Sequence, residues 1–399
     1  MDINYHYFAV KVLAVRAGFN ENDAQVIASY SQFVDDFDTY RYLYFKEVPQ
    51  FAQYLALKVP TGWIFNPVTT GFNSFFDYSR LAVNKYQKEI LIPFHFIPEE
   101  PITVVQSDRR NYRVKPVTMN KESLLQGLLK QAAEMYKVTK SQEDLIRIGT
   151  LLHVFADTYA HQRFSGFWNW ENHAYLKYAE ENLNNNNITG SYSPNTYYYA
   201  PSIGHPNIST SADDSNVTFV MLQKRSEHEN FPYQDRYERD NTTEFTTASR
   251  EIINYLRACL GEGEISDSDW ESIAKDLRKG LKTSVKDEDV LKDIWKGLFG
   301  DITFNYNKNA MYANSLKAYP TQGDDKGQSL DDQVVINIMN NSEDGNDVLL
   351  AGVNEDFFRF NVIADRIRKA VNPNYATEIE FLEYSKDLNL KDYTITDGE

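Results

Sequence analysis

The segment GTLLHVFADTYAHQRFSG, residues 149–166, places two histidines and one aspartate at intervals of four residues. In an α-helix such intervals bring side chains to one face on successive turns, so His153, Asp157 and His161 should project together. Leucine, phenylalanine, alanine and tyrosine occupy the remaining faces, which predicts a helix buried on most sides. A buried, ionised aspartate is costly unless it is paired, hydrogen-bonded or bound to a cation. The segment therefore predicts a buried helix with ligands for one or two divalent metals.

Helical patterns with clear ends extend on both sides of this segment. Apolar stripes predict helices over residues 5–17 and 21–35, with Gly18 as the C-terminal cap of the first and Asn20 as the N-cap of the second. Further helices are expected over 121–138, over 141–163 and over 168–182. Three more amphipathic helices should follow Thr242, and the last clear helix should stop at Pro373.

Two regions lack a helical pattern. Residues 92–119 contain four prolines and short alternation, which indicates loop structure with at most one irregular hairpin. Residues 184–206 begin with four asparagines and contain three prolines, which indicates a long irregular connection. We therefore predict an all-α fold, a multi-helix globular bundle with one long connection and at most one small β-hairpin. We expect a helical metal-site domain over 1–230 and a helical C-terminal region over 231–399 that packs on it, or one continuous domain.

Composition excludes several classes of protein. The chain has 399 residues, with 41 Lys+Arg against 57 Asp+Glu, and this net charge of −16 argues against a cationic surface for duplex nucleic acid. No apolar run approaches the roughly 18–20 residues that span a bilayer, and the N-terminus lacks a signal-peptide pattern, so we expect a cytoplasmic protein. A single cysteine, Cys259, excludes an internal disulfide and a thiolate-rich zinc site. Any metal must then be held by nitrogen and oxygen atoms.

Other histidines and aspartates fall at positions where water should be excluded. His6 lies on the apolar stripe of the first helix, and Asp35 continues the stripe of the second helix, whereas Asp36 falls on its polar side. His95 lies in the proline-bounded segment PFHFIP, and His205 lies in a Gly-His-Pro sequence. The metal ligands that we predict are His6, Asp35, His95, His153, Asp157, His161, His205 and Asp214, with Asp213 as the alternative to Asp214.

These motifs resemble those of an uncharacterised bacterial family that carries PFHFIP, a helix of the form HxxxDTxxHQxFSG and a later Gly-His. More distantly, the order of candidate ligands is similar to that of the zinc-dependent phospholipase C and P1 nuclease superfamily. That resemblance implies a helical fold around a cluster of up to three metal ions, most simply zinc, with iron or manganese as alternatives. Three departures stand out. The superfamily enzymes are typically secreted and use the processed amino terminus as a ligand, whereas this sequence shows no signal-peptide pattern. The histidine after Asp157 follows at a shorter interval than in the superfamily, and His205 lies farther from its acidic partner than one helical turn. A site of one, two or three ions is consistent with the pattern.

The resemblance implies a metal-dependent hydrolase of phosphoric esters, such as a nucleotide, a nucleic acid or a phospholipid. Asp157 and Asp35 are the residues expected to bridge metals or orient the attacking water. One alternative is a helical phosphohydrolase of the HD type, although the chain contains no adjacent His-Asp pair. A second alternative is a non-enzymatic protein with a structural metal or a buried His/Asp network. The substrate, the oligomeric state and a role for His173 stay open.

Overall fold

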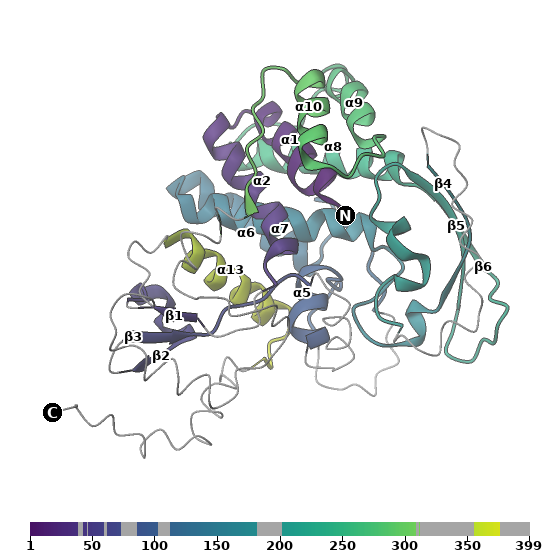
Figure 1. Cartoon of the computed structure of the whole chain (residues 1–399), viewed down its shortest axis with the longest axis horizontal. Coiled ribbons are helices and arrows are strands. Elements are labelled where there is room, and N and C mark those ends of the chain that lie inside the picture. Colours follow the sequence, from purple (N-terminus) through teal and green to yellow (C-terminus); the bar gives the residue numbers. More distant parts are fainter. Residues whose placement is uncertain are drawn as a thin grey trace, which may run out of the picture.

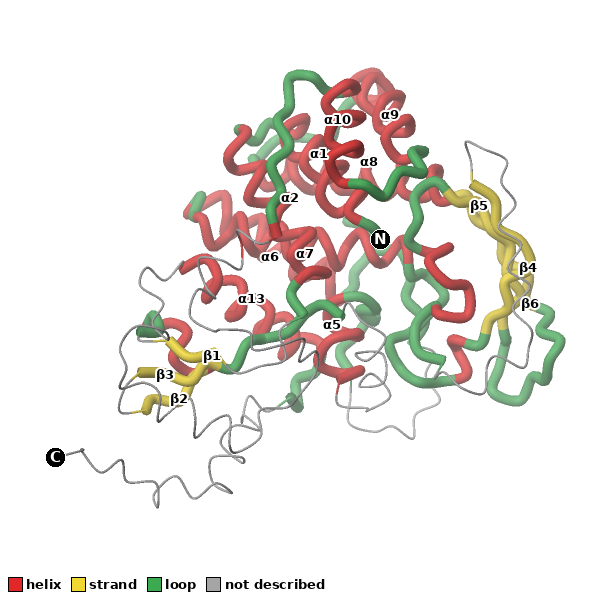
Figure 2. Tube along the Cα trace, viewed as in Figure 1, coloured by secondary structure: helices red, strands yellow, loops and turns green. Residues whose placement is uncertain are grey.

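The computed structural model describes residues 1–38, 43–45, 47–59, 62–72, 86–102, 112–181, 202–308, 311 and 355–375. Helices dominate these residues, and two three-stranded antiparallel sheets flank the helical core on different sides (Figures 1 and 2). The all-α prediction is therefore wrong, because strands are a regular part of the described structure. The expected irregular hairpin includes residues 103–111, and most of the long connection falls at 182–201; both stretches lie outside the described residues.

The N-terminal helices confirm the predicted ends. A π-helical segment, η1 (Asn4–Ala9), continues into α1 (Val10–Ala17), which ends at Gly18 in the left-handed region with φ +116°. The second helix, α2 (Glu21–Asp36), begins where the Asn20 side chain accepts hydrogen bonds from two backbone amides, those of Asn22 and Asp23. Short helical segments follow further along the chain: η2 (Gln50–Leu55), η3 (Gln87–Leu91) and α5 (Ile92–Phe94).

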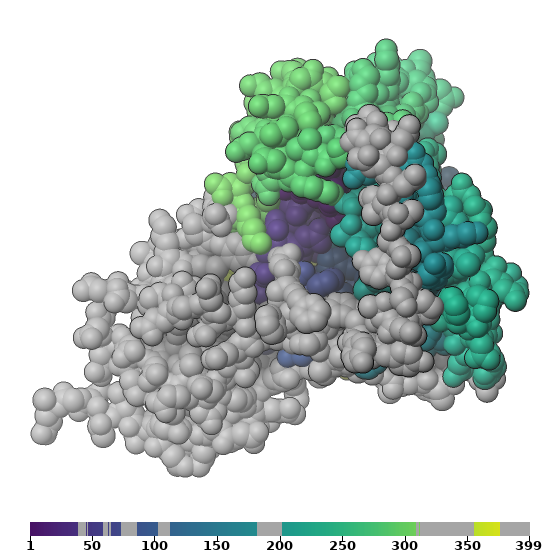
Figure 3. Space-filling view, turned by 45° about the vertical axis from the view of Figure 1, so that its right-hand side comes forward, coloured from purple at the N-terminus to yellow at the C-terminus, as the bar shows by residue number. Residues whose placement is uncertain are grey.

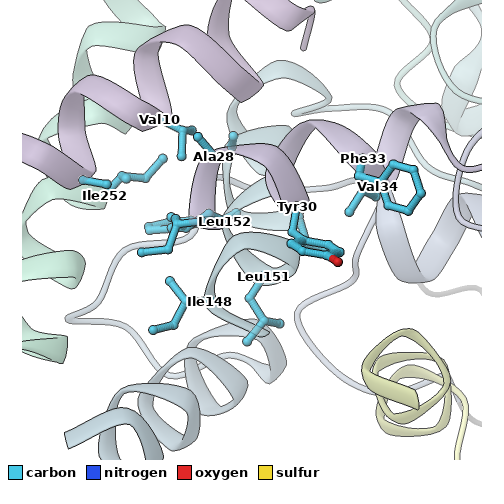
Figure 4. Close-up of a cluster of buried hydrophobic side chains, with 14 of the residues drawn as sticks. Val10, Ala28, Tyr30, Phe33, Val34, Ile148, Leu151, Leu152 and Ile252 are labelled. Carbon is cyan, nitrogen blue, oxygen red and sulfur yellow. The ribbon is translucent and has the colours of Figure 1, made fainter. Parts of the chain in front are cut away.

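Helix α7 (Gln142–Ala160) runs through the middle of the molecule, and α6 (Leu124–Thr139) precedes it (Figure 1). The Ser141 side chain caps α7 by accepting from the amide of Asp144, as expected. Every residue from Asp144 to Ala160 is buried, which confirms the burial predicted from sequence. Helix α7 packs on α2 through apolar side chains that include Ile148, Leu151 and Leu152 (Figure 4).

The C-terminal helices complete the same apolar core. They are α8 (Asn241–Cys259), α9 (Asp267–Leu281), α10 (Glu288–Leu298) and α13 (Glu355–Val371), the last of which ends before Pro373 as predicted. Helix α8 contacts α1, α6 and α7, and α13 contacts α7 and the short helices near it. Buried side chains of all these helices belong to one hydrophobic cluster. No helix in the described ranges is both long and apolar enough to cross a bilayer.

The first sheet has the order β1-β3-β2, with β1 (Leu43–Phe45), β2 (Ala56–Val59) and β3 (Gly62–Phe65), and it lies beside α13 (Figure 1). The second sheet has the order β4-β5-β6, with β4 (Ala174–Glu181), β5 (Val217–Gln223) and β6 (Asp235–Asp240). The prediction of a helix over 168–182 is therefore wrong, because a single 3-10 turn, η4 (Trp170–Asn172), leads into strand β4. A last 3-10 segment, η6 (Pro206–Ala212), lies between the sheet and the end of α7.

Candidate metal centre

Asp157 lies at the centre of a buried cluster that collects side chains from distant parts of the sequence. Its carboxylate is 1% exposed, and its Oδ1 lies 3.1 Å from Nε2 of His6 on η1. The other oxygen, Oδ2, lies 3.1 Å from Nδ1 of His95, which follows α5, and 3.3 Å from Nε2 of His153 on α7. His161, at the end of α7, brings its Nδ1 to 3.5 Å from the same oxygen. One carboxylate thus meets four imidazoles.

Asp35 is the second carboxylate of this cluster. Its Oδ1 lies 3.6 Å from Nε2 of His153 and 3.8 Å from Nδ1 of His95, and its Oδ2 lies 3.8 Å from Nε2 of His6. The side chain is 28% exposed, so it is more open to solvent than Asp157. Asp36 points elsewhere, toward the hydroxyl of Tyr306 at 2.5 Å and the ammonium of Lys308 at 3.4 Å. The helical stripe distinguishes the two neighbouring aspartates as the sequence predicted.

A second set of ligands lies beside the first. Nε2 of His161 is 2.9 Å from Oδ1 of Asp213, and Nε2 of His205 is 3.2 Å from Oδ2 of the same carboxylate. The two imidazoles stack with ring centroids 4.9 Å apart. Asp214 lies outside this set, because its carboxylate accepts from the Thr210 hydroxyl and pairs with Lys286. The structure therefore brings Asp213 into the cluster in place of Asp214.

The α-amino group of Met1 lies between the two sets. Its nitrogen is 2.6 Å from Oδ1 of Asp157 and 3.4 Å from Oδ1 of Asp213. Burial favours the neutral amine, but the neighbouring carboxylates, with Asp157 first, outweigh burial and raise the pKa of this amino group to about 11. The amine therefore belongs to the centre, although the ligands predicted from the sequence did not include it.

Backbone carbonyls fix the orientation of four imidazoles. Nδ1 of His153 lies 2.9 Å from the Ser31 carbonyl, and Nε2 of His95 lies 2.8 Å from the Thr70 carbonyl. Nδ1 of His161 lies 2.6 Å from the His95 carbonyl, and Nδ1 of His205 lies 3.0 Å from the Ser209 carbonyl. A carbonyl can only accept, so the nitrogen that faces it carries the proton. In a neutral ring the opposite nitrogen, which faces the carboxylates, then presents a lone pair.

The cluster consequently brings acceptors face to face. Nε2 of His153 and Nδ1 of His95 lie 3.3 Å apart, and both lie near the oxygens of Asp157 and Asp35. Nδ1 of His6 has no hydrogen-bond partner among the described residues, and its Nε2 faces Asp157. Lone pairs that converge on a buried point are what a divalent cation requires of its ligands, and hydrogen bonds from ring N–H groups to carbonyls are the usual outer contacts of metal-binding histidines.

Charges within the cluster shift its acid–base equilibria in opposite directions. Burial opposes ionisation of Asp157 and Asp213, but the surrounding imidazoles and the Met1 amine hold the pKa of both carboxyls well below the usual range. Burial raises the pKa of Asp35. Burial also keeps the pKa of His6 and His205 low. Burial acts in the same direction on His95, but the hydrogen bond to Asp157 and the charges of Asp157 and Asp35 together outweigh it and raise the pKa of His95.

Three groups of ligands could each hold a cation. Within each group, one ligand atom per residue lies within 4.8 Å of the others. We call the groups site A (His6, His153, Asp157), site B (Asp35, His95, His153) and site C (His161, His205, Asp213). Imidazole nitrogen with carboxylate oxygen suits zinc, iron or manganese, and the donor sets therefore fit the metals expected from sequence. Sites A and B share His153, whose Nε2 can bind one cation at a time because its Nδ1 faces the Ser31 carbonyl, so the two sites compete for this ligand.

The ligands line one side of a cavity of about 290 Å³. Asp35, Asp157 and Asp213 contribute its carboxylates, and no Lys or Arg of the described residues lines it. Apolar side chains complete the lining and include Phe72, Leu91, Phe96, Ile203 and Pro206. Phe96 stacks on the ring of His161 with centroids 4.5 Å apart. The space-filling view shows the purple N-terminal atoms recessed between the green C-terminal helices and the teal segment (Figure 3).

Two further histidines lie away from the cavity. His173 precedes β4, and its Nδ1 lies 3.4 Å from the Tyr233 hydroxyl. His228 is exposed. The sequence did not single out Phe96 or the Met1 amine. The segment PFHFIP indicated a buried position for Phe96, whereas the Met1 amine was not among the ligands that any sequence pattern predicted.

The fold and the centre define a mainly helical protein with two small sheets, in which histidines and aspartates converge on a cavity. The chain belongs to DUF6765, described as a family of unknown function, whose model matches residues 1–374. No curated protein and no solved structure matches the chain.

Proposed function

We propose that the protein is a metal-dependent hydrolase of phosphoric esters with a centre of two or three divalent cations. The observation that carries the proposal is the convergence of three imidazoles, those of His6, His95 and His153, on the carboxylates of Asp157 and Asp35. When both rings are neutral, Nδ1 of His95 and Nε2 of His153 face each other as two acceptors at 3.3 Å, an arrangement that a bound cation would relieve. A network that served only to satisfy buried polar groups would pair donors with acceptors instead.

An open cavity favours a catalytic centre over a structural one. Structural zinc has a closed shell of four protein ligands, whereas a catalytic metal leaves a position for water or substrate. Asp35 is 28% exposed, and both Asp35 and His95 line the cavity, so site B opens on the cavity at these two ligands. The three groups together contain eight different ligand residues, which is more than one closed ion needs.

Phosphoric esters are the substrates that neighbouring cations serve best. Paired divalent cations lower the pKa of bound water and neutralise the charge that develops on the phosphoryl oxygens during in-line attack. The order of ligands along the chain, similar to that of zinc-dependent phospholipase C and P1 nuclease, supports the same class. In this chain Asp157 would hold the cations together, and Asp35, at the open side, would orient the attacking water.

The cavity wall supports a substrate with an apolar portion. Phe72, Phe96 and Ile203 line the cavity together with the ligands and could pack against a nucleobase or an acyl chain. No described Lys or Arg lines the cavity, so the phosphate charge would be balanced by the cations themselves.

Elemental analysis together with a hydrolysis assay tests the proposal. The purified protein should retain two or three equivalents of zinc, iron or manganese and should hydrolyse bis(p-nitrophenyl) phosphate. His153→Ala removes a ligand shared by sites A and B and should lower the metal content and abolish hydrolysis, while His228→Ala, at an exposed histidine, should change neither. A protein that binds no divalent cation would contradict the proposal, and hydrolysis that survives in His153→Ala would contradict the assignment of the centre.

A further inference from the structure

A buried arginine of the second sheet contacts the backbone beside two ligands of site C. Arg239, on β6, is 5% exposed. Its Nη1 donates to the carbonyls of Tyr159 at 2.9 Å and Ala160 at 2.7 Å, and its Nη2 donates to the carbonyl of Ala212 at 2.7 Å. Ala160 directly precedes His161, and Ala212 directly precedes Asp213. A single guanidinium therefore joins the two backbone segments that present these ligands.

Asn241 extends the same set of hydrogen bonds. Its Oδ1 accepts from Nε of Arg239 at 2.7 Å. Its Nδ2 donates to the carbonyl of Ser211 at 2.8 Å and to the carbonyl of Asp214 at 2.7 Å. Asp213 lies between Ser211 and Asp214 in the sequence, so these hydrogen bonds fix the backbone on both sides of this ligand. We call Arg239 and Asn241 together the 239/241 clamp.

The location of the clamp explains why a buried cation is tolerated there. The last carbonyls of α7 have no partners within the helix, and the C-terminal end of a helix favours positive charge. The guanidinium also lies over the rings of Phe219 and Phe245, at 4.9 Å and 6.0 Å from their centroids. Its planar fork of donors fixes several acceptors at once, which a lysine ammonium cannot reproduce.

The other ligand groups are oriented by different contacts. His153, in sites A and B, is held by the Ser31 carbonyl on α2, and His95, in site B, is held by the Thr70 carbonyl. Neither contact involves the 239/241 clamp. Loss of the clamp should therefore act on one site and leave the other two in place.

We propose that Arg239 and Asn241 are positioning residues that set the geometry, and thereby the affinity, of site C alone. This inference rests on the proposed function only for the premise that the centre binds cations. The second sheet then has a role in the metal centre: β6 ties the end of α7 to the segment that carries Asp213.

Metal binding by matched variants tests the inference. Arg239→Lys keeps the charge but loses the fork, and Asn241→Asp keeps the volume but loses both donors. The control is Arg147→Lys, which changes another buried arginine at the opposite end of α7, where it pairs with Glu143 and Asp144. Each protein is stripped of metal and titrated with zinc and with cobalt, whose absorption spectrum reports the ligands of each bound ion.

We expect one binding step of Arg239→Lys and Asn241→Asp to weaken by about 10- to 100-fold, as is usual when outer contacts of a metal site are lost. The remaining binding steps should keep the affinities of the unaltered protein, and the cobalt spectrum of the sites filled in those steps should be unchanged. Arg147→Lys should match the unaltered protein at every binding step. Anomalous diffraction at the zinc edge should show site C as the one that empties.

Unchanged binding in both clamp variants overturns the inference, and so does a parallel weakening of every step. An unaltered protein that binds cations but hydrolyses no phosphoric ester contradicts the proposed function and leaves the inference standing. An unaltered protein that binds no cation overturns both.

Discussion

Adjacent aspartates on α2 have sharply different surroundings. Asp35 lies within 4 Å of three imidazoles of the centre, whereas Asp36 interacts with Tyr306 and Lys308 outside it. Asp35→Asn keeps the shape of the side chain but removes the charge that a cation needs. We expect hydrolysis of bis(p-nitrophenyl) phosphate to fall by roughly 100-fold or more, because a ligand and a water-orienting group are lost together.

The matched control is Asp36→Asn, which removes the same charge one residue along the helix. It should retain hydrolysis within about twofold, since a change outside the cavity removes no interaction made in the transition state. Steady-state kinetics and zinc content are measured for both variants. Equal losses in the two variants would show that the charge of α2, and not the ligand position of Asp35, matters.

Glu171 offers a residue-scale test of stability that is independent of the centre. Its side chain is fully buried and accepts from the amide of Tyr112 at 2.6 Å, and burial raises the pKa of its carboxyl. The folded protein then holds this proton at pH values at which the unfolded chain has released it. Stability contributed by the protonated group is therefore present below the unfolded pKa of about 4.3 and is lost as pH rises through the folded pKa.

Glu171→Gln cannot ionise and should gain thermal stability relative to the unaltered protein as pH rises. The difference in Tm should be small near pH 4 and should grow toward pH 8, as followed by circular dichroism. Glu264→Gln, at an exposed position, should show no such trend. A difference for Glu171→Gln that does not vary with pH would contradict the expected titration.

At the scale of elements, the contact between α2 and α7 holds the centre together. Gly149, on α7, allows the two helices to approach each other closely. A Cβ built at Gly149 would lie 2.4 Å from the carbonyl oxygen of Ile27, which is part of the α2 backbone. Gly149→Ala should therefore force the helices apart and cost about 1–3 kcal/mol of unfolding free energy. The shift should also loosen metal binding, because His153 lies one turn further along α7 and contacts α2 through Ser31.

Gly127, on α6, provides the matched helical glycine, since a Cβ there would meet nothing within 4 Å. Gly127→Ala should stabilise the protein by up to about 1 kcal/mol through helix propensity. Urea unfolding measures both variants. A Gly149→Ala protein as stable as Gly127→Ala would mean that the two helices separate without cost.

The strands show where sequence patterns mislead. Strict alternation marks a half-buried strand, but in β4 the buried apolar residues are Ala174, Leu176 and Ala179, at spacings of two and then three. The register of β4 against β5 shifts between Leu176 and Tyr178, and this irregularity accounts for the extra residue. A spacing of three between apolar residues is also typical of one face of a helix, which is consistent with the helix that was predicted for this segment. Strand β6, with the sequence DRYERD, carries almost no apolar signal at all.

At the scale of the whole molecule, part of the centre could be predicted because Asp35, His153 and Asp157 lie on the regular helices α2 and α7. The interval of four residues placed His153, Asp157 and His161 together, and the stripe of α2 selected Asp35. The choice between Asp213 and Asp214 could not be made, because both follow an irregular 3-10 segment where no periodicity fixes the direction of a side chain. The contacts of Arg239 were also beyond prediction, since they depend on how the second sheet packs on α7.

The centre also links segments that are far apart in the chain. Its ligands come from η1, α2, the residue after α5, α7 and the η6 region, so cations would connect five parts of the fold. A cation that binds only the folded state stabilises it by mass action, by about 2.7 kcal/mol when its concentration is 100 times Kd.

Chelation should therefore lower Tm by several degrees, and zinc added back should restore it in proportion to the logarithm of free zinc above Kd. Thermal unfolding by differential scanning calorimetry measures the shift at fixed free zinc. His153→Ala, which lacks a ligand of sites A and B, should show a smaller shift, and His228→Ala should show the full one. A Tm that stays constant over a range of free zinc in which elemental analysis records binding would mean that the cations bind folded and unfolded chains equally, and the bridging of the five segments by metal would then be wrong.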